Sequence, residues 1–253
     1  MLTAIMGGRI RPILKIYAGI WMACLLSSTS YAFEIFEILR TDADPQFRHE
    51  QIYGCSRPYS AEVHVTINCP TNCPSRSSVI QCATSAGWFR TEVDLTKTTA
   101  MDGKTAADFL GLNRSITIWR PDRNMSYMVS PTRKGYYELP GLIKPGEKYV
   151  PPEPEPLISN KLLGKETIDG HQCLKYHRVF KGYHINDFTV WEAKDLDDFC
   201  IQIQYVDTSL LCEDKPCVIT MLFKQISFKP APSLFEVPKG YQRYDDPLKL
   251  LEP

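Results

Sequence analysis

Apolar and polar residues alternate along much of the chain after residue 60, a pattern typical of strands with one buried face. Residues 61–67 and 88–95 each follow this alternation. Residues 115–139 predict three further strands, because the intervening segments RPDRN and SPTRKG carry residues suited to turns. The pattern therefore predicts a meander of antiparallel strands.

A second set of strands follows in the C-terminal half. Residues 171–180 and 186–196 predict a hairpin, and residues 200–206 and 217–228 predict two more strands. The segment 234–244 is expected to end the fold. We therefore expect a mainly β protein with few helices.

Helical signals are fewer. Residues 104–112 carry apolar positions at helical spacing, and residues 156–164 predict a short helix that ends at Gly164. Residues 33–39 fit a helix or a strand, because a short apolar run does not decide between them. Residues 144–156 are rich in proline and are expected to form an extended loop. Neither half has enough apolar strands to close its own sheet, so this loop is not a domain boundary.

The first 32 residues differ from the rest of the 253-residue chain. Three basic residues precede the apolar run 16–26, and small residues lead to Ala32. This order is typical of a secretory signal peptide cut after Ala32. The run is shorter than the roughly twenty residues of a membrane helix. We therefore expect residues 33–253 to form one exported domain without a membrane span.

Cys24 raises the alternative of a lipid-anchored protein, cut just before this residue. Trp21 stands where a bacterial lipoprotein signal has an aliphatic residue, and Leu25 and Leu26 prolong the apolar run. Cleavage after Ala32 is therefore favoured. It would leave 26 basic and 29 acidic residues, so the chain has no electrostatic attraction toward nucleic acid.

Eight cysteines remain after that cleavage, an even number in an oxidising compartment, which favours disulfides. They are Cys55, Cys69, Cys73, Cys82, Cys173, Cys200, Cys212 and Cys217. A hairpin at CEDKPC would bring Cys212 close enough to Cys217 to form a bridge. Cys69 and Cys73 could pair with each other, or outward with Cys55 or Cys82.

The segment GKETIDGHQCLKY, residues 164–176, places Asp169, His171 and Cys173 at alternate positions, as in a cluster of ligands on one strand face. Asp-Gly is a turn dipeptide, however, so Asp169 is expected in a β-turn and the strand begins near His171. Cys173 becomes a disulfide candidate, with Cys200 as its expected partner.

A zinc site is one further candidate in the sequence. His64, Cys69 and Cys73 have a spacing that zinc could use, with Cys55 or Cys82 completing the site. Disulfides are the favoured interpretation in an exported chain. No metal or other cofactor is therefore expected.

Catalytic motifs of hydrolases and phosphate-binding loops are absent from the sequence. His171 and His177 flank Cys173 on one strand, but an oxidised cysteine would be unreactive. The acidic group at 195–198 lacks the spacing of a calcium loop and predicts a solvated turn. The chain is therefore not expected to be an enzyme.

Many large apolar residues fall on the predicted strands, where most would form core. A curved sheet could instead keep one apolar face open to a lipid-like ligand, closed by short helices. The residues expected to line such a cavity are Trp88, Ile116, Ile118, Trp119, Tyr127, Trp191 and Phe223.

Several stretches together resemble a known family. These are IWRPDRNMSYMVSPTRKGYYELP, LLGKETIDGHQCLKYHRV, VWEAKDL and SLFEVPKGYQRY, spread over residues 88–244. Their order is similar to that in exported bacterial proteins of unknown function related to the lipoprotein-localisation carriers LolA and LolB and to the sensor domain of RseB. The cysteine-rich insert 55–82 and the long proline-rich loop 144–156 depart from the carrier pattern.

The resemblance implies a half-open antiparallel β-barrel of about eleven strands, with short helices as a lid or plug. It also implies a periplasmic, non-catalytic binding protein whose apolar cavity holds a lipid or an acyl chain. The alternative is a disulfide-stabilised structural or sensor module that binds a protein of the cell envelope. The oligomeric state is left open.

Overall fold

The computed structural model describes residues 45–54, 57–68, 75–98, 105, 107, 113–141, 147, 149–150, 154–181, 187–212 and 215–250. Their strands form one sheet of twelve, in the order β12-β6-β5-β4-β3-β2-β1-β11-β10-β9-β8-β7. The strands are β1 (Tyr59–Asn68), β2 (Arg76–Ser85), β3 (Trp88–Asp94), β4 (Arg114–Arg120), β5 (Met125–Ser130), β6 (Gly135–Pro140), β7 (Leu157–Ile168), β8 (His171–Phe180), β9 (Asp187–Ala193), β10 (Phe199–Cys212), β11 (Lys215–Ser227) and β12 (Gln242–Tyr244). Neighbours are antiparallel, except that β12 runs parallel to β6.

The described helices are short. They are α3 (Pro45–Tyr53) and the single turns η2 (Leu95–Lys97), η3 (Pro121–Arg123), η4 (Lys194–Leu196), η5 (Pro232–Phe235) and η6 (Pro247–Leu250). Within this part of the chain, every helix is too short or too polar to serve as a bilayer-spanning segment. The predicted signal peptide (1–32) and nearly all of the predicted helix 104–112 lie outside the described residues.

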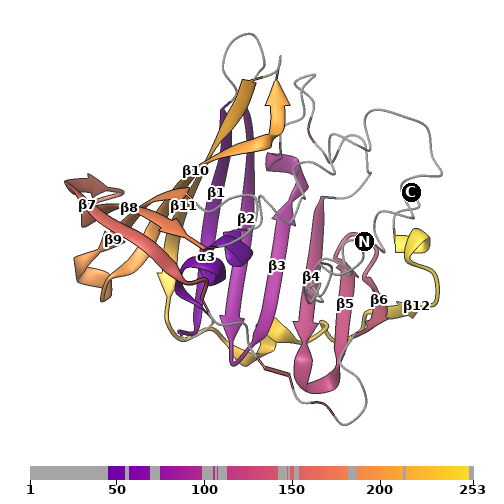
Figure 1. The fold of residues 1–253 in the computed structure, drawn as a ribbon. Helices are drawn as coiled ribbons and strands as arrows, with labels where there is room; N and C mark the ends of the chain where they lie inside the picture. The colour runs from indigo at the N-terminus through magenta and orange to yellow at the C-terminus, as the bar shows by residue number, and fades with distance from the viewer. Residues whose placement is uncertain are drawn as a thin grey trace, which may run out of the picture.

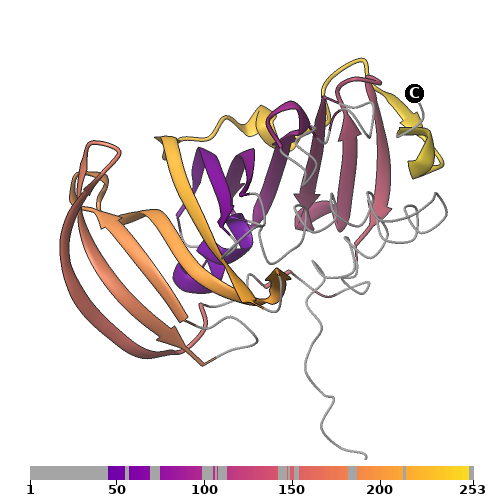
Figure 2. The same cartoon turned by 90° about the horizontal axis from the view of Figure 1, so that it is seen from above.

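The sheet is open and curved, which confirms the expected fold class of a half-open barrel. β7 and β12 form its two edges and do not pair with each other. Seen from above, α3 lies on the inner side of the curve, whereas the C-terminal segment 232–244 runs along the outer side (Figure 2). The two faces are therefore covered by different parts of the chain.

Alternation along β1 decides which residues face inward. Val63 and Val65 are buried on the inner face and lie opposite Phe223 and Met221 of β11. This pairing also joins the strands that precede the proline-rich loop 144–156 to those that follow it. One continuous sheet thus runs through both halves of the chain (Figure 1).

The predicted helix over 156–164 is wrong, because residues 157–164 belong to β7. The segment LISNKLLGKETI pairs with β8 along its length. Its short apolar runs carry no clear period, and the turn that follows β7 decides in favour of a hairpin. That turn confirms the predicted one: Asp169 and Gly170 have φ values of 48° and 87°, as a tight hairpin requires.

Two clusters of buried residues stabilise the sheet. The larger spans α3 and strands from both halves, and the smaller consists of Ile116, Ile118, Tyr127 and Val129 on β4 and β5. Val237 and Tyr241 of the C-terminal segment pack against the smaller cluster. The outer face of β4 and β5 is therefore core because that segment covers it.

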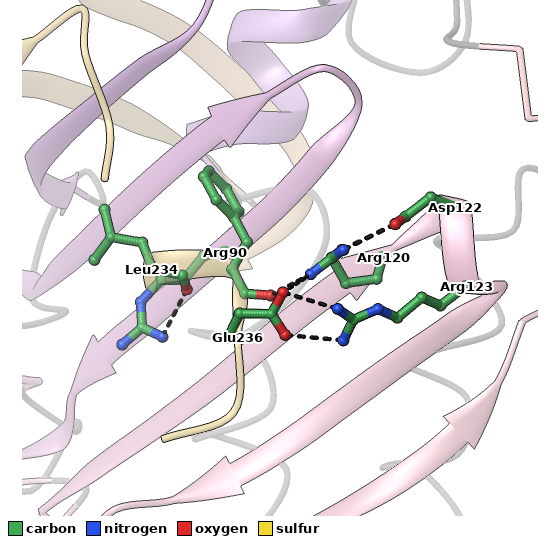
Figure 3. A network of polar contacts seen from close by, with 7 residues as sticks. Arg90, Arg120, Asp122, Arg123, Leu234 and Glu236 are labelled. Atoms are coloured by element: carbon green, nitrogen blue, oxygen red, sulfur yellow. Dashed lines mark hydrogen bonds and ion pairs between the residues drawn. The ribbon is translucent and has the colours of Figure 1, made fainter. Parts of the chain in front are cut away.

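An arginine-centred cluster fastens the C-terminal segment to the sheet (Figure 3). The buried Arg120 donates from Nε and Nη2 to the Asp122 carboxylate at 2.9 and 2.8 Å, and from Nη1 to the Phe235 carbonyl at 3.2 Å. Arg120 also bonds Glu236, which accepts from Arg123 at 2.8 and 2.9 Å. The RPD turn and the SLFEV segment thus meet in one network, which we call the Arg120 cluster.

Two further contacts support the Arg120 cluster. The Arg120 guanidinium lies 4.0 Å from the ring centroid of Trp88, a cation–π arrangement. Arg90 of β3 donates to the Leu234 carbonyl at 3.2 Å. The C-terminal segment is therefore held by strands β3 and β4 and by the turn η3, which follows β4.

Arg120→Lys is expected to lower the free energy of unfolding by about 1–2 kcal/mol, because an ammonium group cannot reproduce the paired contacts. Urea denaturation measures this change. Arg243→Lys is the matched control, since Arg243 forms an exposed pair with Glu138 and its loss should cost less than about 0.5 kcal/mol. Equal effects of the two substitutions would contradict an anchoring role for Arg120.

Candidate functional site

Helix α3 occupies the inner face of the curved sheet, the face on which the sequence led us to expect a ligand. The ring of His49 lies 4.9 Å from Tyr59 of β1, 4.9 Å from Phe199 of β10 and 5.6 Å from Phe223 of β11. Ile52 packs in the larger core cluster. The helix therefore rests on the strands that join the two halves of the chain.

The helix is polar, although the surface beneath it is apolar. Arg48, His49, Glu50 and Gln51 are consecutive and all buried. Arg48 donates to Gln51 at 2.7 Å, and its guanidinium lies 4.9 Å from the ring of Tyr205. Because burying polar groups costs free energy even when most are bonded, α3 complements this face less well than an apolar segment would.

His49 is the clearest mismatch. Its side chain is about one-twentieth exposed, and among the described residues neither Nδ1 nor Nε2 has a hydrogen-bond partner. Desolvation by burial lowers the pKa of His49 from 6.5 to about 3. The imidazole is therefore neutral near pH 7, and its two nitrogens lie unsatisfied within an aromatic cage.

The C-terminal end of α3 is fastened by a buried polar tether. The Tyr53 hydroxyl donates to Glu192 Oε1 at 3.0 Å, and Arg178 pairs with the same oxygen at 2.8 Å. The Arg178 guanidinium also lies 5.3 Å from the Tyr53 ring. Burial raises the pKa of Tyr53 well above 10 and that of the nearby Cys200 thiol to about 12, so both groups stay protonated.

The predicted cavity residues do not gather at one place. Ile116, Ile118 and Tyr127 point to the outer face, under the C-terminal segment. Trp88 also lies on that side, in an edge-to-face contact with Phe235 at 5.7 Å. These four residues are packed against the protein's own chain.

The other three predicted cavity residues lie apart from one another. Phe223 faces inward beneath His49, and Trp119 faces inward farther along the sheet, 6.4 Å from the ring of Tyr149. Trp191 is buried on the outer side, where its Nε1 donates to Glu166 at 2.8 Å. Phe223 is thus the predicted cavity residue that contacts α3, and ligand contact by any of the seven stays a prediction.

The residues considered for catalysis are engaged elsewhere. His171 Nδ1 contacts Asp195 at 2.7 Å, and His177 Nε2 contacts Asp187 at 2.6 Å. The Cys173 thiol donates to the backbone carbonyl of His171 at 3.4 Å, and burial raises the pKa of Cys173. A protonated thiol that faces a carbonyl is a poor nucleophile.

The described residues bring no set of metal ligands together. Within the described ranges, no group of three histidine, cysteine, aspartate or glutamate residues could hold a metal ion. Asp169 pairs with Lys224 at 3.3 Å, and His64 with Glu62 at 2.7 Å. Asp198 pairs with Lys194 at 2.7 Å, as in the solvated turn that the sequence predicts.

The cysteines follow the predictions only in part. Cys82, Cys173 and Cys200 are buried and, in the described part of the chain, form no disulfide. The predicted Cys173–Cys200 bridge is wrong, because β9 lies between β8 and β10. Strands two positions apart are separated by roughly 9–10 Å, beyond the reach of a disulfide.

The predicted hairpin at CEDKPC is confirmed as the turn between β10 and β11. Cys217 takes part in a disulfide, with a partner outside the described side chains. Cys55, Cys69 and Cys73 lie outside the described residues, as does the Cys212 side chain. The pairing of these cysteines, including Cys212 with Cys217, stays a prediction.

Helix α3, the element that covers the inner face, was not predicted from the sequence. The segment PQFRHEQIY lacks the apolar period of a surface helix. Its ends carry signals that could have revealed it: proline opens the helix, and Gly54 follows it with φ of 70°. Pairing of Tyr53 with residues far along the chain left no trace in the sequence.

No model of a known protein family matches the sequence, and no curated protein matches it. Solved structures offer distant likenesses. LprF from Mycobacterium bovis is 10% identical, with a TM-score of 0.40 over 73% of this chain and 90% of that one. A LolA superfamily protein from Nitrosomonas europaea is 10% identical, with a TM-score of 0.30 over 76% and 94%. The MucA/MucB complex of Pseudomonas aeruginosa gives 11% identity and a TM-score of 0.37 over 78% and 62%.

Proposed function

We propose that this protein is a non-catalytic binding protein of the bacterial periplasm that holds the apolar chain of a lipid or lipoprotein on the concave face of its sheet. One observation carries this proposal: an apolar inner face is covered by a buried polar helix that matches it poorly. A segment that leaves polar atoms unsatisfied is easier to replace by an apolar chain than well-packed core is.

On this proposal α3 is the resident occupant of the binding face. An incoming acyl chain would take over its contacts with Tyr59, Phe199 and Phe223, while His49 would regain water. The desolvation of two imidazole nitrogens is relieved in the exchange. The polar tether from Tyr53 to Glu192 opposes the displacement of α3. The relief at His49 and the loss of this tether together set the affinity for the acyl chain.

The protonated state of the buried Cys173 and Cys200 thiols supports a binding function over a catalytic one. Burial raises the pKa of both Cys173 and Cys200, which disfavours the thiolate needed for nucleophilic attack. The histidines near Cys173 are bonded to aspartates at the sheet surface. An export signal and a disulfide framework, both expected from the sequence, are consistent with a periplasmic location.

Uptake of a fluorescent fatty acid by the mature chain tests the proposal. Phe223→Ala is expected to weaken binding about tenfold or more, because it removes a wall of the site. Ile52→Ala is expected to speed uptake, since it loosens α3. Binding should also raise the melting temperature of the wild-type protein, because the ligand binds the native state alone.

The matched control is Leu222→Ala. Leu222 precedes Phe223 on β11 and points to the opposite face, so its truncation should leave uptake unchanged. Circular dichroism of each variant separates loss of binding from loss of folding. A wild-type protein that takes up no fatty acid, and from which solvent extracts no lipid, would refute the carrier function.

A structural or sensor module that binds envelope proteins is the second candidate function. The exposed apolar edge strand β7 favours this alternative, because apolar side chains in a free edge usually meet a partner.

A further inference from the structure

Strand β7 is an exposed apolar edge of the sheet. It pairs with β8 on one side and lies at the end of the strand order. Leu157, Ile158, Leu162 and Leu163 are all exposed, Ile158 to 64% and Leu162 to 54%. In Figure 2, β7 to β9 form the part of the sheet that extends away from the strands around α3. A twelve-residue edge strand with exposed apolar side chains is a ready template for another strand.

Two irregularities limit which strand can pair with this edge. The register against β8 shifts between Leu157 and Ser159 and again between Leu162 and Gly164. Bulges of this kind protect an edge from regular strands. A second copy of the same strand carries the same irregularity and can match it.

The charges of β7 also favour its own copy. With a twofold axis between Leu162 and Leu163, Lys161 lies opposite the partner's Gly164 and Asn160 opposite the partner's Lys165. Moving the axis onto Leu163 would set Lys161 opposite the partner's Lys165, although these two side chains lie on opposite faces of β7, so this register does not match the pleat. In the favoured register, the twofold axis falls at the register shift between Leu162 and Gly164.

The favoured register adds an attraction between the copies. Lys161 and Glu166 face His177 and Cys173 of β8, which are on one side of that strand. They therefore share a face of β7. In the paired copies, Lys161 is diagonal to the partner's Glu166, and the twofold axis repeats this contact.

We propose that β7 is a self-association surface, on which a second copy of this chain adds its own β7 antiparallel about an axis between Leu162 and Leu163. The pairing continues the sheet from one copy into the other through main-chain hydrogen bonds. The β7 residues of this interface are separate from Tyr59, Phe199 and Phe223 under α3, so the proposed self-association does not depend on the proposed lipid binding.

Sedimentation velocity of the mature, ligand-free chain at concentrations up to about 100 μM tests the proposal, and a dimer is expected in this range. Leu162→Lys should weaken the dimer at least about tenfold, because it brings two ammonium groups to the axis. Val206→Lys is the matched control: Val206 is 50% exposed, but it lies on the interior strand β10. This control should dimerise like the wild type.

Charge exchange tests the register. Lys161→Glu should weaken the dimer more than Lys161→Gln does, because it places a carboxylate diagonal to the partner's Glu166. Glu166 itself is left unchanged, because it also accepts from Trp191 and pairs with Lys175. Circular dichroism confirms that each variant is folded. The proposal is overturned if the wild-type protein stays monomeric at all concentrations tested, or if the Leu162→Lys variant dimerises normally. In either case β7 would be a binding edge for a strand of another protein.

Discussion

Replacing Arg178 with methionine is expected to lower the free energy of unfolding by about 3–5 kcal/mol. The Arg178 and Glu192 side chains are 12% and 10% exposed and form a pair at 2.8 Å. Methionine fills the space but leaves the Glu192 carboxylate buried without its cation. The Tyr53 hydroxyl donates to the same carboxylate, so the attachment of α3 weakens as well. Urea denaturation measures the loss.

Lys175→Met provides the matched control on the same strand. Lys175 pairs with Glu166 at 3.3 Å in a more exposed position, and its loss should cost less than about 1 kcal/mol. Hydrogen exchange at the α3 amides should rise in Arg178→Met and stay unchanged in Lys175→Met. If both variants lose the same stability, the buried tether does not anchor the helix.

Lowering the pH from 7 to 5 is expected to cost the folded state about 2 kcal/mol through His49 alone. Burial lowers the pKa of His49 from 6.5 to about 3. Below pH 6.5 the His49 imidazole therefore binds a proton in the unfolded chain but stays neutral in the folded chain. Stability from this residue is complete above pH 6.5 and is lost progressively as the pH falls toward 3. Denaturation curves at several pH values measure this slope.

His49→Phe isolates this effect, because phenylalanine fits the aromatic cage without titrating. The two proteins differ only at residue 49, so the difference between the two slopes belongs to His49. The ring of Tyr53 lies 5.0 Å from that of His49, and the Tyr53 hydroxyl is bonded to Glu192, which also pairs with Arg178. Identical slopes would mean that His49 is not buried in its neutral form.

Local patterns predicted the strands well where a turn reinforced them. The meander β4 to β6 followed from the RPDRN and SPTRKG turns, and the Asp169-Gly170 turn was predicted as it occurs. The same reasoning failed for β7, because its apolar residues come in pairs with no clear period and its strand partner comes later in the chain. Pairing with β8 in the tertiary structure makes this segment a strand, and its local sequence propensity does not.

The candidate site was harder to predict, because its elements meet only through the tertiary fold. Phe223 was expected at an apolar site, but α3 was missed because its residues are polar and carry no apolar face. The pairing of Arg178 with Glu192 and Tyr53 joins residues far apart in sequence. The Cys173–Cys200 bridge failed because spacing along the chain does not reveal that a third strand separates the two.

The pairing of β1 with β11 has a consequence for how the chain folds. These two strands lie in the middle of the sheet but far apart in the sequence. Closing such a long loop is slow, because its entropy must be lost before any contact forms. Strands β1 to β6 can assemble as a meander while the rest of the chain is still being delivered, and β1 is then a free edge. Until β11 arrives, the unpaired backbone groups of β1 can pair with a strand of another unfolded chain, so this stage of folding is the one most prone to aggregation.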